Sequence, residues 1–195
     1  ISAVMLVRKV KLSPSVFLAH AKALERSNAK YPIRRVVCKT FTVPAGYLDV
    51  SHEKLFSGQL PTRMAVGLVR NDAFNGALGH NPFNFNHFSL NEIAVYVDGQ
   101  QQQCIKPLHP NFATEQYISS YIGLFTGTGK LNKDDGNNIA RSDYDKGYAL
   151  YAFDLSPDLA EDDHFNLCRQ GGVRLVLKFA TALTVTVSVV AYAEF

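Results

Sequence analysis

Apolar and polar residues alternate with a period of two through much of this chain, most clearly near its C-terminus. The odd positions of 173–179 carry Val, Leu, Leu and Phe, and those of 185–195 carry Val, Val, Val, Ala, Ala and Phe. Successive side chains of a β-strand point to opposite faces, so this pattern predicts two strands that each bury one face. The residues 180–184 between them are few enough for a hairpin-like return.

Shorter segments of the same character predict further strands along the whole chain. They lie at 3–12, 33–43, 64–68, 93–97 and 148–155. The pair Asp98-Gly99, which favours a tight turn, closes one of them. Together with the two C-terminal segments, these patterns predict at least seven strands.

Helical spacing is limited to two segments. The first, 15–27, follows Ser13-Pro14, in which a hydroxyl suits the N-cap and proline suits the first helical position. The second begins at Thr114 and ends at Gly123 or just after. Both lie between predicted strands, so we interpret them as insertions in a β fold.

Two loops are long, and they help to choose between β folds. The loop 70–91 is dense in Asn, Gly and Phe, and 126–147 is rich in Gly, Asn and Asp. Loops longer than about 12–15 residues in a compact domain are usually functional or mobile. We therefore expect an all-β fold in a single domain over 1–195, an eight-stranded jelly-roll β-sandwich with two short inserted helices and long end loops.

The composition favours a folded protein with part of its surface covered by neighbours. Of its residues 47% are hydrophobic and 19% charged, below the roughly 25% charged residues of a usual soluble domain. A net charge of +3 without Lys/Arg blocks gives no footprint for nucleic acid. The three cysteines are widely spaced, which suits neither a disulfide framework nor clustered metal ligands, and we interpret them as reduced, buried thiols.

The ends of the chain and its apolar segments bear on its location. No segment reaches the ~18 apolar residues of a membrane helix, and the opening lacks the pattern of a signal peptide. We therefore expect a soluble protein that is made inside a cell and is not secreted. Because the chain opens on Ile1 and stops at Phe195 within an alternating pattern, we also expect a piece of a longer polypeptide.

The segment GLFTGTGK at 123–130 resembles a phosphate-binding loop but departs from its pattern. Five residues instead of four separate Gly123 from Gly129, and Leu131 stands where a magnesium-binding hydroxyl is required. An ordinary Gly-rich turn explains the segment better.

Other candidate chemistry is also incomplete. The six histidines include no His-x-His pair, and the closest two, His80 and His87, lie in a long loop, so we expect no metal site. The run 133–138 resembles half of a calcium loop without its terminal glutamate. The carboxylates at 161–163 suit a helix or turn start, and Cys104 lies near a histidine only in sequence. We predict no catalytic residues, no cofactor and no enzyme.

Four phenylalanines of the first long loop are the candidate functional residues. Phe74, Phe83, Phe85 and Phe88 are large apolar side chains in a segment rich in Gly and Asn, and leaving them all in water is costly. Either they fold back on the domain or they enter a neighbouring subunit, and both alternatives stay open. We name these four as candidate residues of a subunit interface.

Several segments, in order along the chain, carry a resemblance to a known family. They are LVRKVKLSPSVFLAHAKALE, AKYPIRRV, FSGQLPTRMAVGLV, AFNG, NPFNFNHFSLN, YVDG, FTGTGK, GNNIARSDY, GYALYAFDLSPDL, NLCRQGGVRL and VVAYAEF. Together they are similar to the C-terminal part of the major capsid protein, hexon-like and double jelly-roll, of Polinton/Maverick elements and the related adintoviruses. The likeness runs from about Met5 to Phe195.

The resemblance implies a structural protein of a virion or a virus-like transposon. Such proteins form homotrimers whose jelly rolls make pseudo-hexameric capsomers of an icosahedral shell, next to neighbouring capsomers and a minor penton-type capsid protein. This chain would be the second jelly roll of a longer double jelly-roll chain, located in the virion capsid. The resemblance offers no catalytic residues, and we expect no direct contact with nucleic acid or membrane.

Three other functions stay open at this point. A lectin-like or cytokine-like ligand-binding jelly roll is disfavoured by the lack of a signal peptide pattern, of an Asn-x-Ser/Thr sequon and of Trp. A cupin-like metalloenzyme would need metal ligands that the sequence does not cluster. A domesticated capsid protein with a role in a host cell is compatible with the same residues.

Overall fold

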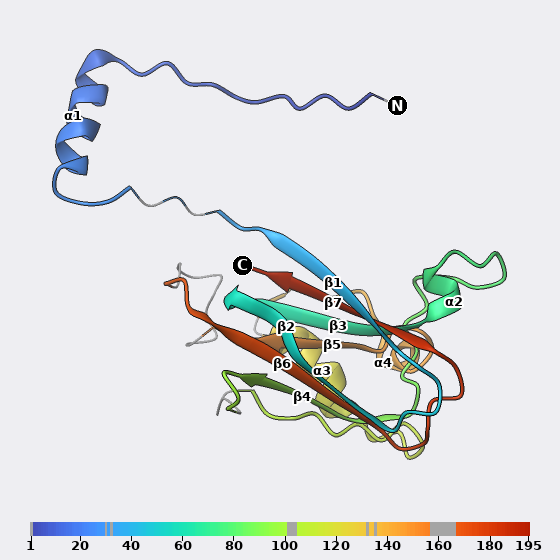
Figure 1. The fold of residues 1–195 in the computed structure, drawn as a ribbon. Coiled ribbons are helices and arrows are strands. Elements are labelled where there is room, and N and C mark those ends of the chain that lie inside the picture. The colour runs from blue at the N-terminus through green and yellow to red at the C-terminus, as the bar shows by residue number, and fades with distance from the viewer. Residues whose placement is uncertain are drawn as a thin grey trace. The chain divides into compact units, whose positions relative to one another are not determined.

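The computed structural model of the protein describes residues 2–29, 31, 33–100, 105–131, 133–134, 136–156 and 167–195. It divides into two compact units, one within residues 1–33 and the other at Arg34–Phe195. The smaller unit consists of an extended segment followed by helix α1 (Pro14–Leu24), and none of its described residues is buried (Figure 1). The larger unit contains all the strands of the described residues.

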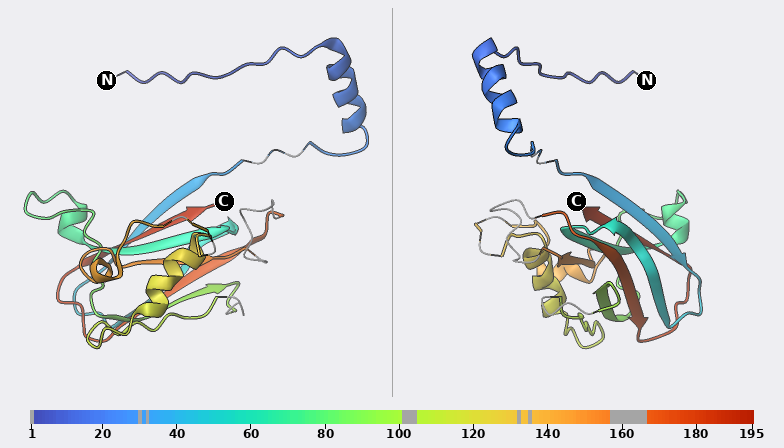
Figure 2. Two further views of the ribbon diagram at one scale, coloured as in Figure 1. Left: turned by 180° about the vertical axis from the view of Figure 1, so that it is seen from behind. Right: turned by 60° about the vertical axis from the view of Figure 1, so that its left-hand side comes forward.

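The larger unit is a sandwich of two antiparallel sheets (Figure 1 and Figure 2). One sheet has the strand order β1-β7-β3-β5 and the other β2-β6-β4. The strands are β1 (Val36–Val43), β2 (Asp49–Gln59), β3 (Arg63–Arg70), β4 (Leu90–Val97), β5 (Leu150–Asp154), β6 (Gln170–Phe179) and β7 (Val187–Glu194). The predicted all-β architecture is confirmed, with seven strands in the described residues instead of eight.

The core lies between the two sheets and follows the period-two pattern. In β6 the side chains of Val173, Leu175 and Leu177 are fully buried, and in β7 those of Val187 and Val189 are. Burial of one such side chain contributes about 1.5–3 kcal/mol. The alternation in the C-terminal part of the sequence is therefore the pattern that builds the core.

Each connection between consecutive strands crosses the sandwich, because the odd-numbered strands lie in one sheet and the even-numbered strands in the other. This alternation fits the connectivity of a jelly roll. The predicted hairpin-like return at 180–184 is therefore wrong. The buried Leu183 fills the space between the sheets; its N–H donates to the carbonyl of Tyr47, and its carbonyl accepts from the N–H of Gly46.

The place beside β4, where a jelly roll would have its eighth strand, holds an isolated bridge in the described residues. Ile93 and Leu108 exchange two backbone hydrogen bonds of 3.0 Å each. Hydrogen-bonded positions alternate along an antiparallel ladder, so Pro110 occupies the next one. Proline has no N–H to donate, which explains why the pairing ends there.

Two strand predictions differ from the structure. The segment 3–12 is extended but belongs to neither sheet, whereas β2 was not predicted. In β2 the register with β6 shifts between His52 and Phe56, and the adjacent residues Leu55 and Phe56 are both buried. This bulge breaks the alternation on which the prediction of a strand rests.

The helices of the described residues are α1, α2 (Asn71–Phe74), α3 (Ile118–Gly127) and α4 (Arg141–Tyr144). The two predicted helices are present as α1 and α3, but α3 begins at Ile118 instead of Thr114. Helix α1 belongs to the smaller unit, so the prediction that both helices are insertions in the β fold is wrong for α1. The two four-residue helices were not predicted. Helix α3 lies against β5 so closely that a Cβ added at Gly127 would be 2.6 Å from the carbonyl carbon of Ala152. None of the described helices combines the length and the apolar character that a membrane span requires.

The contact between α3 and β5 can be tested with two glycines of the same helix. Gly127→Ala should lower the free energy of unfolding by about 1–3 kcal/mol, because its methyl group collides with backbone. Gly123→Ala is the matched control: its nearest neighbours would be 3.8 Å and 3.9 Å away, so the helix gains up to about 1 kcal/mol. Urea unfolding measures both variants, and equal effects would contradict the close approach.

Candidate subunit interface

The loop that joins β3 to β4 begins with α2 and is fixed by a charged cluster. Arg70 donates two hydrogen bonds, 3.0 Å and 2.6 Å long, to the carboxylate of Asp72, which also accepts the N–H of Ala73 at 2.8 Å. The Nε2 atom of His80 lies 3.5 Å from Oδ2 of Asp72. The hydrogen bonds from Arg70 lower the pKa of Asp72 to about 2. These contacts restrain the start of this loop although it faces solvent.

The four candidate phenylalanines divide into two pairs. Phe85 packs over Gly67 of β3, where an added Cβ would lie 2.6 Å from its Cδ1, and its backbone bonds to Gly147 and Ala149. Phe88 is partly buried against the core between the sheets. Phe74 and Phe83, in contrast, are 45% and 76% exposed. The loop folds back at two positions and presents aromatic rings to solvent at the other two.

A third exposed apolar side chain belongs to the same loop. Leu78 is fully exposed between Gly76 and Gly79, in the part of the loop that stands out from the end of the sandwich after α2 (Figure 1). A single leucine in a Gly-rich segment forms no periodic pattern, so nothing in the sequence marks it as an interface residue. We call Phe74, Leu78 and Phe83 the apolar tip; it is the surface of this loop that is available for a partner.

The loop ends in a turn with unusual backbone angles. Phe88 and Ser89 have φ values of 45° and 55°, and the N–H of Leu90 donates to the carbonyl of His87 at 2.8 Å. Residues with side chains adopt such angles at a cost of about 1–3 kcal/mol each. The structure offsets this cost with a hydrogen bond of 2.9 Å from the N–H of Ser89 to Nδ1 of His87.

His87 is held in its neutral form by its surroundings. Its ring stacks on Phe112 with centroids 4.1 Å apart, and burial lowers its pKa, an effect that the charge of Asp145 partly opposes. Because Nδ1 accepts the hydrogen bond from Ser89, a proton on that atom would break the bond. The turn that follows the apolar tip is therefore more stable at neutral pH than at an acidic pH at which His87 gains a proton.

The second long loop is packed against α3 through aromatic residues. Tyr121 donates its hydroxyl to the carbonyl of Ile139 at 2.8 Å, and the buried Tyr144 donates to the carbonyl of Leu150 at 2.8 Å. Burial raises the pKa of Tyr144 far above its usual range. Rings of Phe112 and Tyr121 lie on the same cluster. The described part of this loop packs against the sandwich and exposes less apolar surface than the first loop.

The phosphate-loop pattern proves to be a helix end. Gly129 has a φ of 69°, and the N–H of Lys130 donates to the carbonyl of Phe125 at 2.7 Å. The Thr128 hydroxyl donates to the carbonyl of Leu124. These bonds satisfy the last carbonyls of α3, which is the ordinary role of a glycine after a helix.

The other candidate metal ligands do not come together in the part of the chain that the structure describes. There, no group of three or more His, Cys, Asp or Glu side chains is arranged to hold a metal ion. Cys38 and Cys168 are exposed, so the prediction of buried thiols is wrong for these two cysteines. The carboxylates at 161–163, Cys104 and His164 lie outside the described residues.

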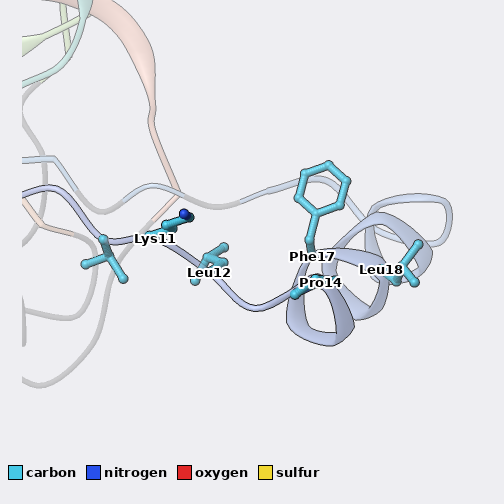
Figure 3. A pocket seen from close by; sticks show the side chains of 6 residues that line it. Lys11, Leu12, Pro14, Phe17 and Leu18 are labelled. Atoms are coloured by element: carbon cyan, nitrogen blue, oxygen red, sulfur yellow. The ribbon is translucent and has the colours of Figure 1, made fainter.

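The smaller unit also exposes apolar residues. A pocket lies between its extended segment and the first turns of α1 (Figure 3). It is lined by Val10, Lys11, Leu12, Pro14, Phe17 and Leu18, all of them exposed. With a single charged residue in its lining, this surface suits apolar contact better than the binding of a polar ligand.

Comparisons with known proteins give distant similarities. No protein-family model matches the chain. An uncharacterized protein of Caenorhabditis elegans is 28% identical over 165 residues, which cover 82% of this chain and 38% of that protein. The chain therefore spans less than two fifths of the length of this curated relative.

Among solved structures, similar chains come from viral capsids. The major capsid protein of STIV is 12% identical with a TM-score of 0.39, over 83% of this chain and 40% of that one. The major capsid protein P2 of bacteriophage PM2 is 14% identical with a TM-score of 0.40, over 84% and 51% of the two chains. The PBCV-1 virus capsid gives 12% identity and a TM-score of 0.34, over 88% and 45%.

The role of His87 leads to a prediction about pH. We expect its pKa to lie below its ordinary value of 6.5, so its contribution to stability is complete above pH 6.5 and is lost as the pH falls through the lower folded-state pKa. An NMR titration of the ring, together with urea unfolding from neutral pH down to about 5, measures both effects.

The variant His87→Asn is the control for this prediction. An asparagine side chain accepts the N–H two residues further on but does not titrate, so the pH-dependent part of the stability should disappear. A pKa of His87 at or above 6.5 would contradict the proposed hydrogen bond at Nδ1.

Proposed function

We propose that this chain is a structural subunit of a viral or virus-like capsid, and that it works by assembling with copies of itself. Two observations support assembly as a capsid subunit. The sequence resembles hexon-like major capsid proteins of Polinton/Maverick elements and adintoviruses in many segments along the chain. The strands of the larger unit form two sheets connected in the alternating order that a jelly roll requires.

The apolar tip is the observation that carries the proposal. Its three side chains stand on a loop that is anchored at the start by Arg70 and Asp72, and at the end by the turn at His87. An apolar surface held in one conformation loses little entropy when a partner covers it. Large apolar side chains of this kind are the usual centres of protein interfaces.

The arrangement of the assembly follows from the resemblance. The protein is the second jelly roll of a longer double jelly-roll chain. That longer chain forms a homotrimer whose jelly rolls build a pseudo-hexameric capsomer. Capsomers contact one another and a minor penton-type protein in the shell of a virion. Each contact recurs around the trimer axis, so a modest apolar patch contributes several times to one assembly.

The candidate phenylalanines give a matched test of this function. Phe83→Ala should weaken self-association roughly tenfold or more and leave the free energy of unfolding unchanged, because Phe83 is exposed and has no core contact. Phe85→Ala should instead lower the free energy of unfolding by about 1–3 kcal/mol, because its ring packs over Gly67. Light scattering over a concentration series measures the first effect, and urea unfolding the second.

Leu78→Ala provides a second variant of the apolar tip and should act in the same direction as Phe83→Ala. The proposal predicts oligomers of the wild-type chain whose mass depends on concentration. Two results would count against an interface at the apolar tip. One is a wild-type chain that stays monomeric at every concentration, and the other is an oligomer mass that neither substitution changes.

A further inference from the structure

The two sheets differ in how their edges are covered. In the sheet of four strands, β5 is one edge and is covered by α3, which contacts Ala152 through Gly127. In the other sheet, the edge strand β4 carries the bridge to Leu108. The edge strand β2 is interrupted by its bulge. Among the described strands, β1 is an edge strand that pairs with one neighbour, β7, in a register without shifts over its whole length.

The backbone of β1 offers hydrogen bonds on its outer side. Arg35 and Phe195 exchange both backbone hydrogen bonds, at 3.1 Å and 2.9 Å. Hydrogen-bonded pairs alternate along an antiparallel ladder, so the N–H and carbonyl groups of Val36, Cys38 and Thr40 point away from β7. An edge of this kind is a template for a further strand.

The core is also incompletely closed beside β1. Phe41 of β1 stacks on His52 of β2 with centroids 4.4 Å apart, and Phe41, Val37 and Val50 are only partly buried. Lys39 places its Nζ 5.2 Å from the ring centroid of Phe56. A strand added next to β1 would cover this opening if the face that it turned inwards were apolar.

The extended segment of the smaller unit has such a face. We call residues 2–12 the arm. Its even positions hold Val4, Leu6, Val10 and Leu12 together with Ser2 and Arg8, whereas its odd positions begin with Ala3, Met5 and Val7 and continue with Lys9 and Lys11. Val4, Leu6 and Val10 are 82%, 93% and 75% exposed, and the arm pairs with no strand. Its length matches the eight residues of β1 with some to spare.

We propose that the arm of one copy adds as a strand to the open edge of β1 in a second copy. The even-numbered side chains of the arm cover the opening beside Phe41, and the odd-numbered side chains share the outer face with Cys38 and Thr40. Main-chain hydrogen bonds provide the attachment, and the alternating faces set the register. The proposal rests on the proposed function for the identity of its partner, a second copy of this chain.

The native thiol of Cys38 allows a test of both the contact and the face. Two versions of the 195-residue chain are mixed, both with Cys104→Ser and Cys168→Ser. One keeps Cys38, and the other has Cys38→Ser and one cysteine in the arm, at Met5, Val7 or Lys9 or, as controls, at Leu6 or Val10. Only a contact between copies can then form a disulfide, and it requires Cβ atoms about 3.5–4.5 Å apart.

The proposal predicts a disulfide-linked dimer on a non-reducing gel from the odd arm positions and its loss from the even ones. No cross-link from any position, or equal cross-links from both faces, would overturn it. Oligomers of the wild-type chain seen by light scattering without the cross-link would overturn the arm contact and leave the proposed function standing. A monomeric wild type would count against the function itself.

Proline substitutions test the same contact through the backbone. Thr40→Pro removes an outward N–H without touching the ladder with β7, and Val7→Pro interrupts the arm, so either should abolish the cross-link from Lys9→Cys. Ala29→Pro, in an exposed segment outside the arm and α1, is the matched control and should leave it intact. Thermal unfolding shows whether the Thr40→Pro variant folds. If it does not fold, the test depends on Val7→Pro, because Val7 lies in the smaller unit, which has no buried residues among those described. A cross-link that survives Val7→Pro would overturn the proposal.

Discussion

The burial of the inner faces of β6 and β7 is the interaction on which the rest of the larger unit depends. β6 lies between β2 and β4, and β7 lies between β1 and β3, so each holds two neighbours in place. A slip of one residue in either strand would turn its buried side chains, such as Leu175 and Val189, towards water. With the register set in this way, the ends of the sandwich carry long loops without loss of the core.

The parts of the fold that depend on periodicity were open to prediction from sequence, and the parts that depend on partners were not. The alternation at 173–179 predicted a strand correctly because its buried face is continuous. The same kind of pattern at 3–12 predicted a strand that belongs to neither sheet. An alternating pattern shows which face of a segment is apolar, but it does not show whether another strand is available to pair with it. Strand β2 was not predicted, because the bulge leaves two adjacent residues buried and so interrupts the period-two pattern.

The candidate interface shows the same limit at the level of single residues. Composition predicted that the phenylalanines of the first loop need cover, and the structure provides it for Phe85 and Phe88. What separates them from Phe74 and Phe83 is the close approach of the loop to Gly67, a contact between distant parts of the chain that no local pattern encodes. The clamp between Arg70 and Asp72 was equally invisible, because neighbouring opposite charges in a sequence have many possible arrangements.

The cover that α3 places over β5 has a consequence for the behaviour of the protein at high concentration. Open edges on both sides of a sheet allow copies to add without end, which is how β proteins form fibres. Here the close contact of Gly127 with Ala152 closes one side of the four-stranded sheet. Copies that met edge to edge through β1 would therefore stop at a pair, because neither has a second open edge in that sheet to offer.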